Sequence, residues 1–105
     1  MTMYRQGDVL LIRVDDIDTT APQQRDTAGR IVLAYGEVTG HAHAIHDHGV
    51  TLYGTDLAER FLEVLTEGGA ILSHEEHGPI QLPEGNYRVV RQREWAPEGA
   101  RWIAD

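Results

Sequence analysis

The sequence predicts an all-β fold, a small single-domain barrel or sandwich with at most one short helix. Its eleven glycines and four prolines divide the chain into segments of about 5–10 residues, a length that suits strands better than helices. Leu10, Ile12 and Val14 alternate along one such segment and give it an apolar face. The chain has 105 residues, 41% of them hydrophobic, so we expect one domain, residues 1–105, around one core.

Several segments between the turns carry the β-branched and aromatic residues that strands favour. We predict strands, in chain order, at Asp8–Val14, Arg30–Tyr35, Val38–Ile45, Thr51–Tyr53, Phe61–Thr66, Ala70–Glu75, Asn86–Glu94 and Arg101–Ile103. The stretch Asp15–Arg25 is polar and has no apolar pattern, which predicts an exposed loop. Pro83 and Gly85 predict a type II turn ahead of the strand at Asn86, with glycine supplying a positive φ.

Leu57–Leu65 is the one segment with two readings. Its apolar residues recur at helical spacing, with Asp56 as a candidate N-cap and Gly68 just beyond the end. The same residues also describe a strand that enters a hairpin turn, and the neighbouring segments are strands. We therefore favour a strand here and keep a short helix as the alternative.

The charge balance argues against a polyanionic partner. The chain carries 9 Lys and Arg against 17 Asp and Glu, for a net charge of −8. The only local cluster of arginines is Arg88, Arg91 and Arg93, a weak basic footprint, so we expect no nucleic acid as a partner.

We also expect no membrane association. The longest uninterrupted apolar run, Val9–Ile12, is far shorter than the ~20 residues that a membrane-spanning helix needs. The segment Met1–Asp8 shows neither the apolar stretch nor the cleavage site of a signal peptide, so a cytoplasmic location is expected.

The histidines offer metal ligands, and the chain has no cysteine, so a metal would have to be held by nitrogen and oxygen atoms. Residues two apart on a strand point to the same face, so His41 and His43 project together. We predict both as metal ligands. His46 and His48 form a second such pair near Gly49, and their role is left open.

A second cluster, His74-Glu75-Glu76-His77, stands directly before Gly78-Pro79. On a regular strand His74 and His77 would face opposite sides, but a bend at the Gly-Pro pair would bring them to one centre. We predict His74 and His77 as further ligands. Glu75 or Glu76 is then the catalytic base, or alternatively a third ligand or a partner that orients a ligand.

Together the two motifs predict a site for a divalent transition metal, with zinc, iron(II), manganese and nickel all compatible. If a coordination position stays open, the metal would activate water or a small-molecule substrate. The alternative is a non-enzymatic accessory module, with a structural metal or none, that acts through its edge strands and Trp95 and Trp102 and forms a homo-oligomer.

Five segments carry a resemblance to a small bacterial and phage-type family of uncharacterised proteins: Tyr4–Leu11, Gly36–His43 (GEVTGHAH), His74–Ile80 (HEEHGPI), Leu82–Tyr87 and Gln92–Trp95. The resemblance covers most of the chain and implies no activity. The pair His41 and His43 is also similar to the first motif of cupins, which are metal-binding β-barrels. That likeness implies both histidines as ligands in a fold that serves dioxygenases, isomerases and simple binding proteins.

Overall fold

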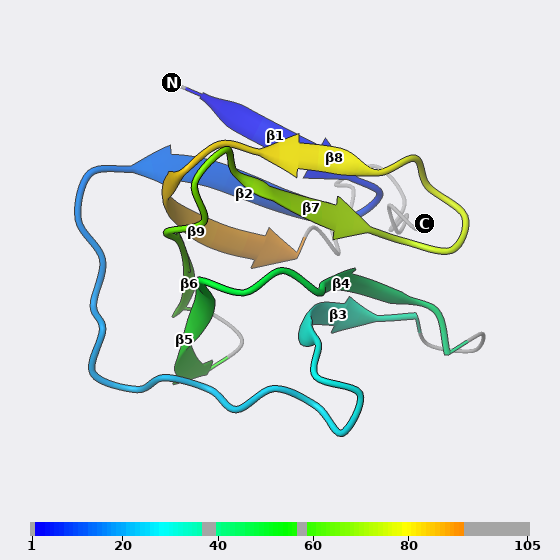
Figure 1. Ribbon diagram of the computed structural model, residues 1–105, viewed down its shortest axis with the longest axis horizontal. Helices are drawn as coiled ribbons and strands as arrows, with labels where there is room; N and C mark the ends of the chain where they lie inside the picture. The colour runs from blue at the N-terminus through cyan, green and yellow to red at the C-terminus, as the bar shows by residue number, and fades with distance from the viewer. Residues whose placement is uncertain (1, 37–39, 57–58, 92–105) are drawn as a thin grey trace, which may run out of the picture.

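The all-β prediction is confirmed. The computed structural model describes residues 2–36, 40–56 and 59–91, and these hold no helix. Figure 1 shows the strands in chain order: β1 (Met3–Gln6), β2 (Val9–Val14), β3 (Ile31–Tyr35), β4 (Ala42–Ile45), β5 (Val50–Asp56), β6 (Glu59–Val64), β7 (Ala70–Ser73), β8 (Ile80–Leu82) and β9 (Gly85–Arg91).

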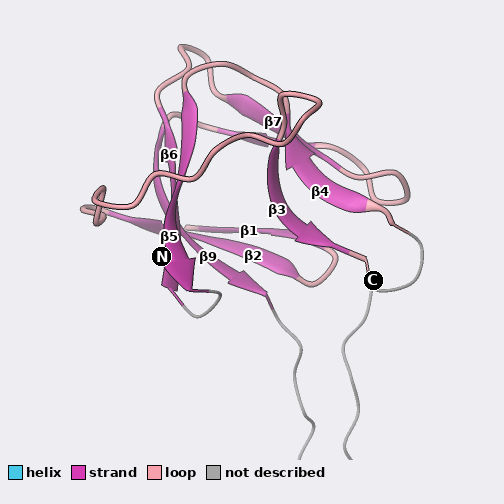
Figure 2. Ribbon diagram, turned by 90° about the horizontal axis from the view of Figure 1, so that it is seen from below, coloured by secondary structure: helices cyan, strands magenta, loops and turns pink. Residues whose placement is uncertain are grey.

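The strands form two antiparallel sheets that face each other (Figure 2). One sheet has the order β1-β2-β9-β6-β5 and the other the order β3-β4-β7-β8. The edges of the sheets come close, β1 to β8 and β3 to β5, but no strand pairing joins them in the described part of the chain. The fold is therefore a sandwich whose edges approach each other, and the closed-barrel form of the prediction is not reached.

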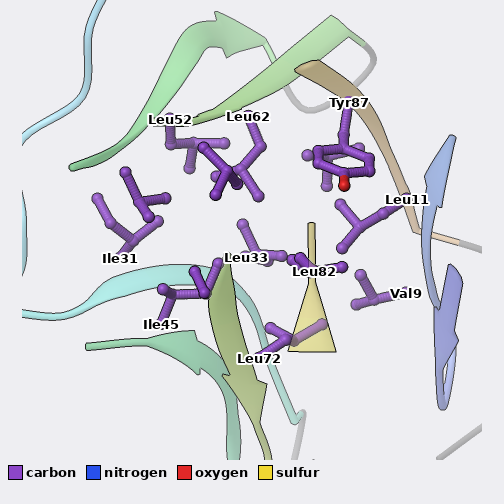
Figure 3. Close-up of a cluster of buried hydrophobic side chains, with 14 of the residues drawn as sticks. Val9, Leu11, Ile31, Leu33, Ile45, Leu52, Leu62, Leu72, Leu82 and Tyr87 are labelled. Carbon is purple, nitrogen blue, oxygen red and sulfur yellow. The ribbon is translucent and has the colours of Figure 1, made fainter. Parts of the chain in front are cut away.

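Side chains from the inner faces of both sheets fill the space between them (Figure 3). Leu62 of β6 and Ile45 of β4 are fully buried, and Leu11 and Leu72 nearly so. Burying a side chain of this size stabilises the fold by roughly 1.5–3 kcal/mol. Tyr87 lies in the same core and donates its hydroxyl to the carbonyl of Pro83 at 2.6 Å, and burial raises the pKa of that phenol.

Most predicted strands lie within a few residues of the observed ones. Two strands were missed: β1, whose outward-facing residues are largely exposed, and β8, which is only three residues long. Both are edge strands, so neither carries the two-sided apolar pattern that marks a buried strand. Of the predicted strand Val38–Ile45, the described part begins at Gly40, and the predicted strand Arg101–Ile103 lies outside the described residues.

The helical alternative at Leu57–Leu65 is wrong for the residues that the structure describes. Glu59–Val64 forms β6, between β5 and β9, and Leu57 lies outside the described residues. Leu62 and Val64 are fully buried, while Leu65, which a helix would have buried, is 61% exposed. The segment is a strand rather than a helix because β5 and β9 on either side pair with it through backbone hydrogen bonds.

The predicted loop at Asp15–Arg25 contains no strand, and one β-bridge joins its Pro22 to Tyr53. Gly85 has a positive φ of 153°, but it is the first residue of β9 and this value is far from the φ of about +80° that a type II turn requires, so the structure does not confirm the predicted turn. Among the described residues there is no helix with the length and apolarity that crossing a bilayer requires.

Candidate metal centre

The inward-facing positions of the sandwich change from apolar to polar at one end. In β6 Arg60 precedes the buried Leu62 and Val64, and in β4 His43 precedes the buried Ile45. β1 ends and β2, β4 and β8 begin on this side, the right-hand side of Figure 1. We call the following residues the polar end: Gln6, Asp8, His43, Arg60 and Arg91.

His43 is held rigidly in the polar end by Gln6. The amide nitrogen of Gln6 donates to the carbonyls of Leu72 and Gly78, both at 3.0 Å, so its oxygen must face His43. That oxygen lies 2.9 Å from Nδ1 of His43, which therefore acts as the donor. The same contacts tie β1 of one sheet to β7 of the other.

The second ring nitrogen of His43 faces Asp8. Nε2 lies 3.4 Å from Oδ1 of Asp8, and the other carboxylate oxygen of Asp8 accepts a hydrogen bond from Nε of Arg91 at 2.8 Å. His43 is 1% exposed and Asp8 3% exposed. Both ring nitrogens of His43 thus point at protein groups, an arrangement that suits a positioning residue better than a metal ligand.

The predicted second cluster begins where the pairing of β7 with β4 stops. The last paired residues are Ala44 and Ser73. Two residues further along, a carboxylate oxygen of Glu75 accepts the backbone N–H of Ala42 at 2.9 Å and replaces the missing strand partner. This hydrogen bond is the main reason why the pKa of Glu75 lies below its usual value, and the neighbouring His41 and His74 lower it further.

His74 organises the turn that follows. Its Nδ1 accepts hydrogen bonds from the backbone N–H groups of Glu76 at 3.0 Å and His77 at 3.3 Å. The bend that the sequence predicted at this point brings His74 and His77 together, with ring centroids 4.7 Å apart. Since Nδ1 acts as an acceptor, a neutral His74 carries its proton on Nε2.

All four predicted histidine ligands lie in one cluster. The ring centroids of His43 and His74 are 4.3 Å apart, those of His41 and His74 are 5.8 Å apart, and those of His43 and His77 are 6.0 Å apart. The register explains the gathering, since β4 and β7 run side by side and continue toward His41 and His74. Their roles as ligands stay a prediction.

Three residues bring possible ligand atoms close enough to share one ion. One atom each of His41, His74 and Glu75 lie within 4.8 Å of one another. Ligands bound to zinc at ~2.1 Å in a tetrahedral site are about 3.4 Å apart, so side-chain shifts of about 1 Å would close this group around an ion. Glu75, predicted as a base or a ligand, falls among the ligand atoms.

The carboxylate of Glu76 faces His41. Its carboxylate lies 2.8 Å from Nδ1 of His41, and both side chains are partly exposed. A histidine that donates Nδ1–H to a carboxylate presents Nε2 to a metal, a common arrangement around bound ions. His46 and His48 are exposed and lie beyond the other end of β4, away from this cluster.

The sequence reasoning missed Gln6, Asp8, Arg60 and Arg91. The signal was strand alternation: Arg60 continues the inward positions of Leu62 and Val64. Arg60 donates from Nη2 to the carbonyl of Leu33 at 2.8 Å, and Arg91 donates from Nη2 to that of Tyr35 at 2.7 Å. Both arginines thereby cover the backbone of β3, an edge strand.

The comparisons with known proteins agree with the expectation of an uncharacterised family. A family model described as "Domain of unknown function (DUF8820)" matches residues 5–92, a range that contains both histidine clusters and the polar end. No curated protein and no solved structure matches the chain.

Proposed function

Since the chain belongs to the DUF8820 family of domains of unknown function, we propose a function from the site itself: the protein binds one divalent transition metal ion through His41, His74 and Glu75. The observation that carries the proposal is the closeness of the three ligand atoms, all within 4.8 Å of one another. Imidazole and carboxylate ligands suit zinc, iron(II), manganese or nickel.

The neighbours of these ligands support the proposal. Glu76 accepts Nδ1–H of His41 and so directs the lone pair of a neutral ring to Nε2. Glu75 has a lowered pKa, so its carboxylate is ionised at neutral pH, as a ligand must be. His43 and His77 lie against His74 and keep the ring in place.

His74 must change its hydrogen bonds before it can bind a metal ion. Its Nδ1 accepts two backbone N–H groups, so Nε2 of the neutral ring carries a proton and has no lone pair for a metal. Binding through either nitrogen therefore requires the turn at Glu76 and His77 to release Nδ1. Metal binding should shift the amide signals of these two residues.

Three protein ligands leave a coordination position open, which is typical of catalytic rather than structural sites. A metal bound here would supply Lewis acidity toward water or a small-molecule substrate. In this proposal Glu76 is not a ligand and accepts a proton from the metal-bound group; its contact with the ligand His41 supports this role.

We also propose that the protein is related to cupins. In its support, His41 and His43 flank a small alanine at the start of β4, and the edges of the two sheets approach each other as in an incompletely closed barrel. We retain a cytoplasmic location and a small-molecule partner as parts of this proposal.

Zinc titration calorimetry on protein stripped with EDTA and then dialysed tests the proposal. We expect about one equivalent of zinc, an affinity loss of at least about tenfold in His41→Ala, and a smaller loss in Glu76→Gln. His46→Ala is the matched control, because it removes an exposed histidine away from the cluster.

Two outcomes would overturn the proposal: no saturable binding of zinc, iron(II), manganese or nickel, or equal zinc affinity in His41→Ala and His46→Ala. Unfolding of the wild-type protein by EDTA would instead assign the metal a structural role.

A further inference from the structure

Arg60 is a buried arginine that has no carboxylate as a hydrogen-bond partner in the described part of the chain. The residue is 6% exposed. Its Nη2 donates to the carbonyl of Leu33, but its Nε is buried, and no hydrogen-bond partner for that atom lies in the described part of the chain. A guanidinium keeps its proton under all conditions that proteins meet, so Arg60 cannot escape this cost by becoming neutral.

Among the described residues, the charges of the polar end do not balance Arg60. The carboxylate of Asp8 already accepts a hydrogen bond from Arg91 at 2.8 Å. The polar end therefore holds two arginines against one aspartate. Arg91 adds electrostatic repulsion to burial, and both lower the pKa of Arg60.

A purely structural role accounts for only part of this arrangement. The bond from Arg60 to Leu33 ties β6 to the edge strand β3, and a neutral amide side chain would donate the same bond without a buried charge. Buried charges in proteins are normally paired, and an unmatched one needs an explanation. Arg91, whose side chain is 27% exposed, lies beside Arg60 and marks where the polar end meets solvent.

From these observations we infer that the polar end binds a small oxyanion, a carboxylate or a phosphate, that pairs with the guanidinium of Arg60. The planar guanidinium offers Nε–H and a second N–H of Nη2 side by side, a geometry that matches two oxygens of one anion. The anion also supplies the negative charge that the two arginines and Asp8 lack. This inference does not require the metal site, since none of its residues is a proposed metal ligand.

Binding is measured by thermal unfolding on protein stripped of metal with EDTA and then dialysed, because EDTA itself carries carboxylates. Malonate and inorganic phosphate are the two probes. Sodium chloride at matched ionic strength is the reference, because it separates specific binding from screening. We expect a melting temperature that rises and saturates with at least one probe. A malonate response assigns a carboxylate ligand and a phosphate response a phosphorylated one.

Arg60→Met removes the charge and keeps the aliphatic stem. We expect it to weaken binding of the anion by roughly 30-fold or more, as for the loss of one partner of a buried charge pair. Arg88→Met is the matched control, since it makes the same charge change at an exposed position of β9 and should respond as the wild type does. Arg60→Lys retains the charge without the two-pronged geometry and should bind with intermediate affinity.

If Arg60→Met does not fold, amide chemical shifts of the wild-type protein provide the second measurement. The anion should shift Leu33, Arg60 and Arg91 and leave Ile71, on the outer face of β7, unchanged. The inference is overturned if neither probe exceeds the sodium chloride reference, if Arg60→Met binds as Arg88→Met does, or if the shifts map away from these residues. Failure of zinc binding would leave these outcomes unaffected.

Discussion

Replacement of Gln6 by alanine should be among the most destabilising single changes in the polar end. Gln6 is 2% exposed and makes three hydrogen bonds: its amide donates to the carbonyls of Leu72 and Gly78, and its oxygen accepts Nδ1–H of His43. Each such bond contributes about 1 kcal/mol net, and a buried donor left without a partner costs about 1–3 kcal/mol more. Three bonds at about 1 kcal/mol each and one unpaired donor give a loss of about 4–6 kcal/mol from the free energy of unfolding.

Urea unfolding at neutral pH measures this loss, because a domain of this size is expected to unfold in a single transition. A typical domain has a stability of about 5–15 kcal/mol, so a loss of this size removes a large fraction of the total and the urea midpoint should fall sharply. Gln81→Ala is the matched control: this glutamine lies on β8, is exposed and makes one hydrogen bond, to the carbonyl of Gly68. Its cost should stay below about 1 kcal/mol.

Equal free energies of unfolding for Gln6→Ala and Gln81→Ala would refute the reasoning. In that case the hydrogen bonds that join β1 to β7 would contribute no more than a surface contact, and the orientation assigned to His43 would lose its support.

Two further predictions concern backbone strain and acid stability. Gly69→Ala should lower the free energy of unfolding by at least about 2 kcal/mol, because φ is +92° and the new Cβ would overlap the carbonyl oxygen of Leu82. Gly68→Ala is the control: its φ is +84° but the space around it is open, so the loss in the same urea assay should be about 1 kcal/mol. Equal losses for the two variants would contradict the overlap. The folded pKa of Glu75 lies below its ordinary value of 4.5, because its carboxylate accepts the backbone N–H of Ala42. This hydrogen bond therefore stabilises the fold above pH 4.5, and its contribution is lost as the pH falls through the folded pKa. Glu75→Gln should therefore melt below the wild type at pH 6 and approach it near pH 3 in metal-free buffer, and a gap that widens toward pH 3 would reverse the assigned sign.

Local patterns in the sequence predicted much of the fold. Period-two alternation located β2, and frequent glycines predicted short elements, because strand faces and turn conformations depend on a few neighbouring residues. The alternation did not identify the inner face: Val9 and Leu11 belong to the core, whereas Ile12 and Val14 on the predicted apolar face are only partly buried. The segment Leu57–Leu65 matched both periods, and only the hydrogen bonds of β6 to β5 and β9 distinguish them. Pairing of β2 with β9 joins residues such as Leu11 and Val89, which no local pattern relates.

The candidate site, too, was predicted in part from local patterns and depends in part on contacts between distant residues. Spacing alone predicted that His41 and His43 share a face and that Gly78-Pro79 bends the chain after His77, because these are properties of single strands and turns. Which nitrogen each histidine presents depends on its hydrogen-bond partner, and for His43 those partners are Gln6 and Asp8, more than 30 residues away in the chain.

The sequence by itself therefore determined an all-β chain of short strands with two histidine clusters and no cysteine. The tertiary structure decided the open sandwich, the orientation of His43 and the burial of Arg60 beside Arg91. The physical reason is that alternation and turn preferences act between neighbours, whereas burial and hydrogen-bond partners arise only when distant strands pack face to face.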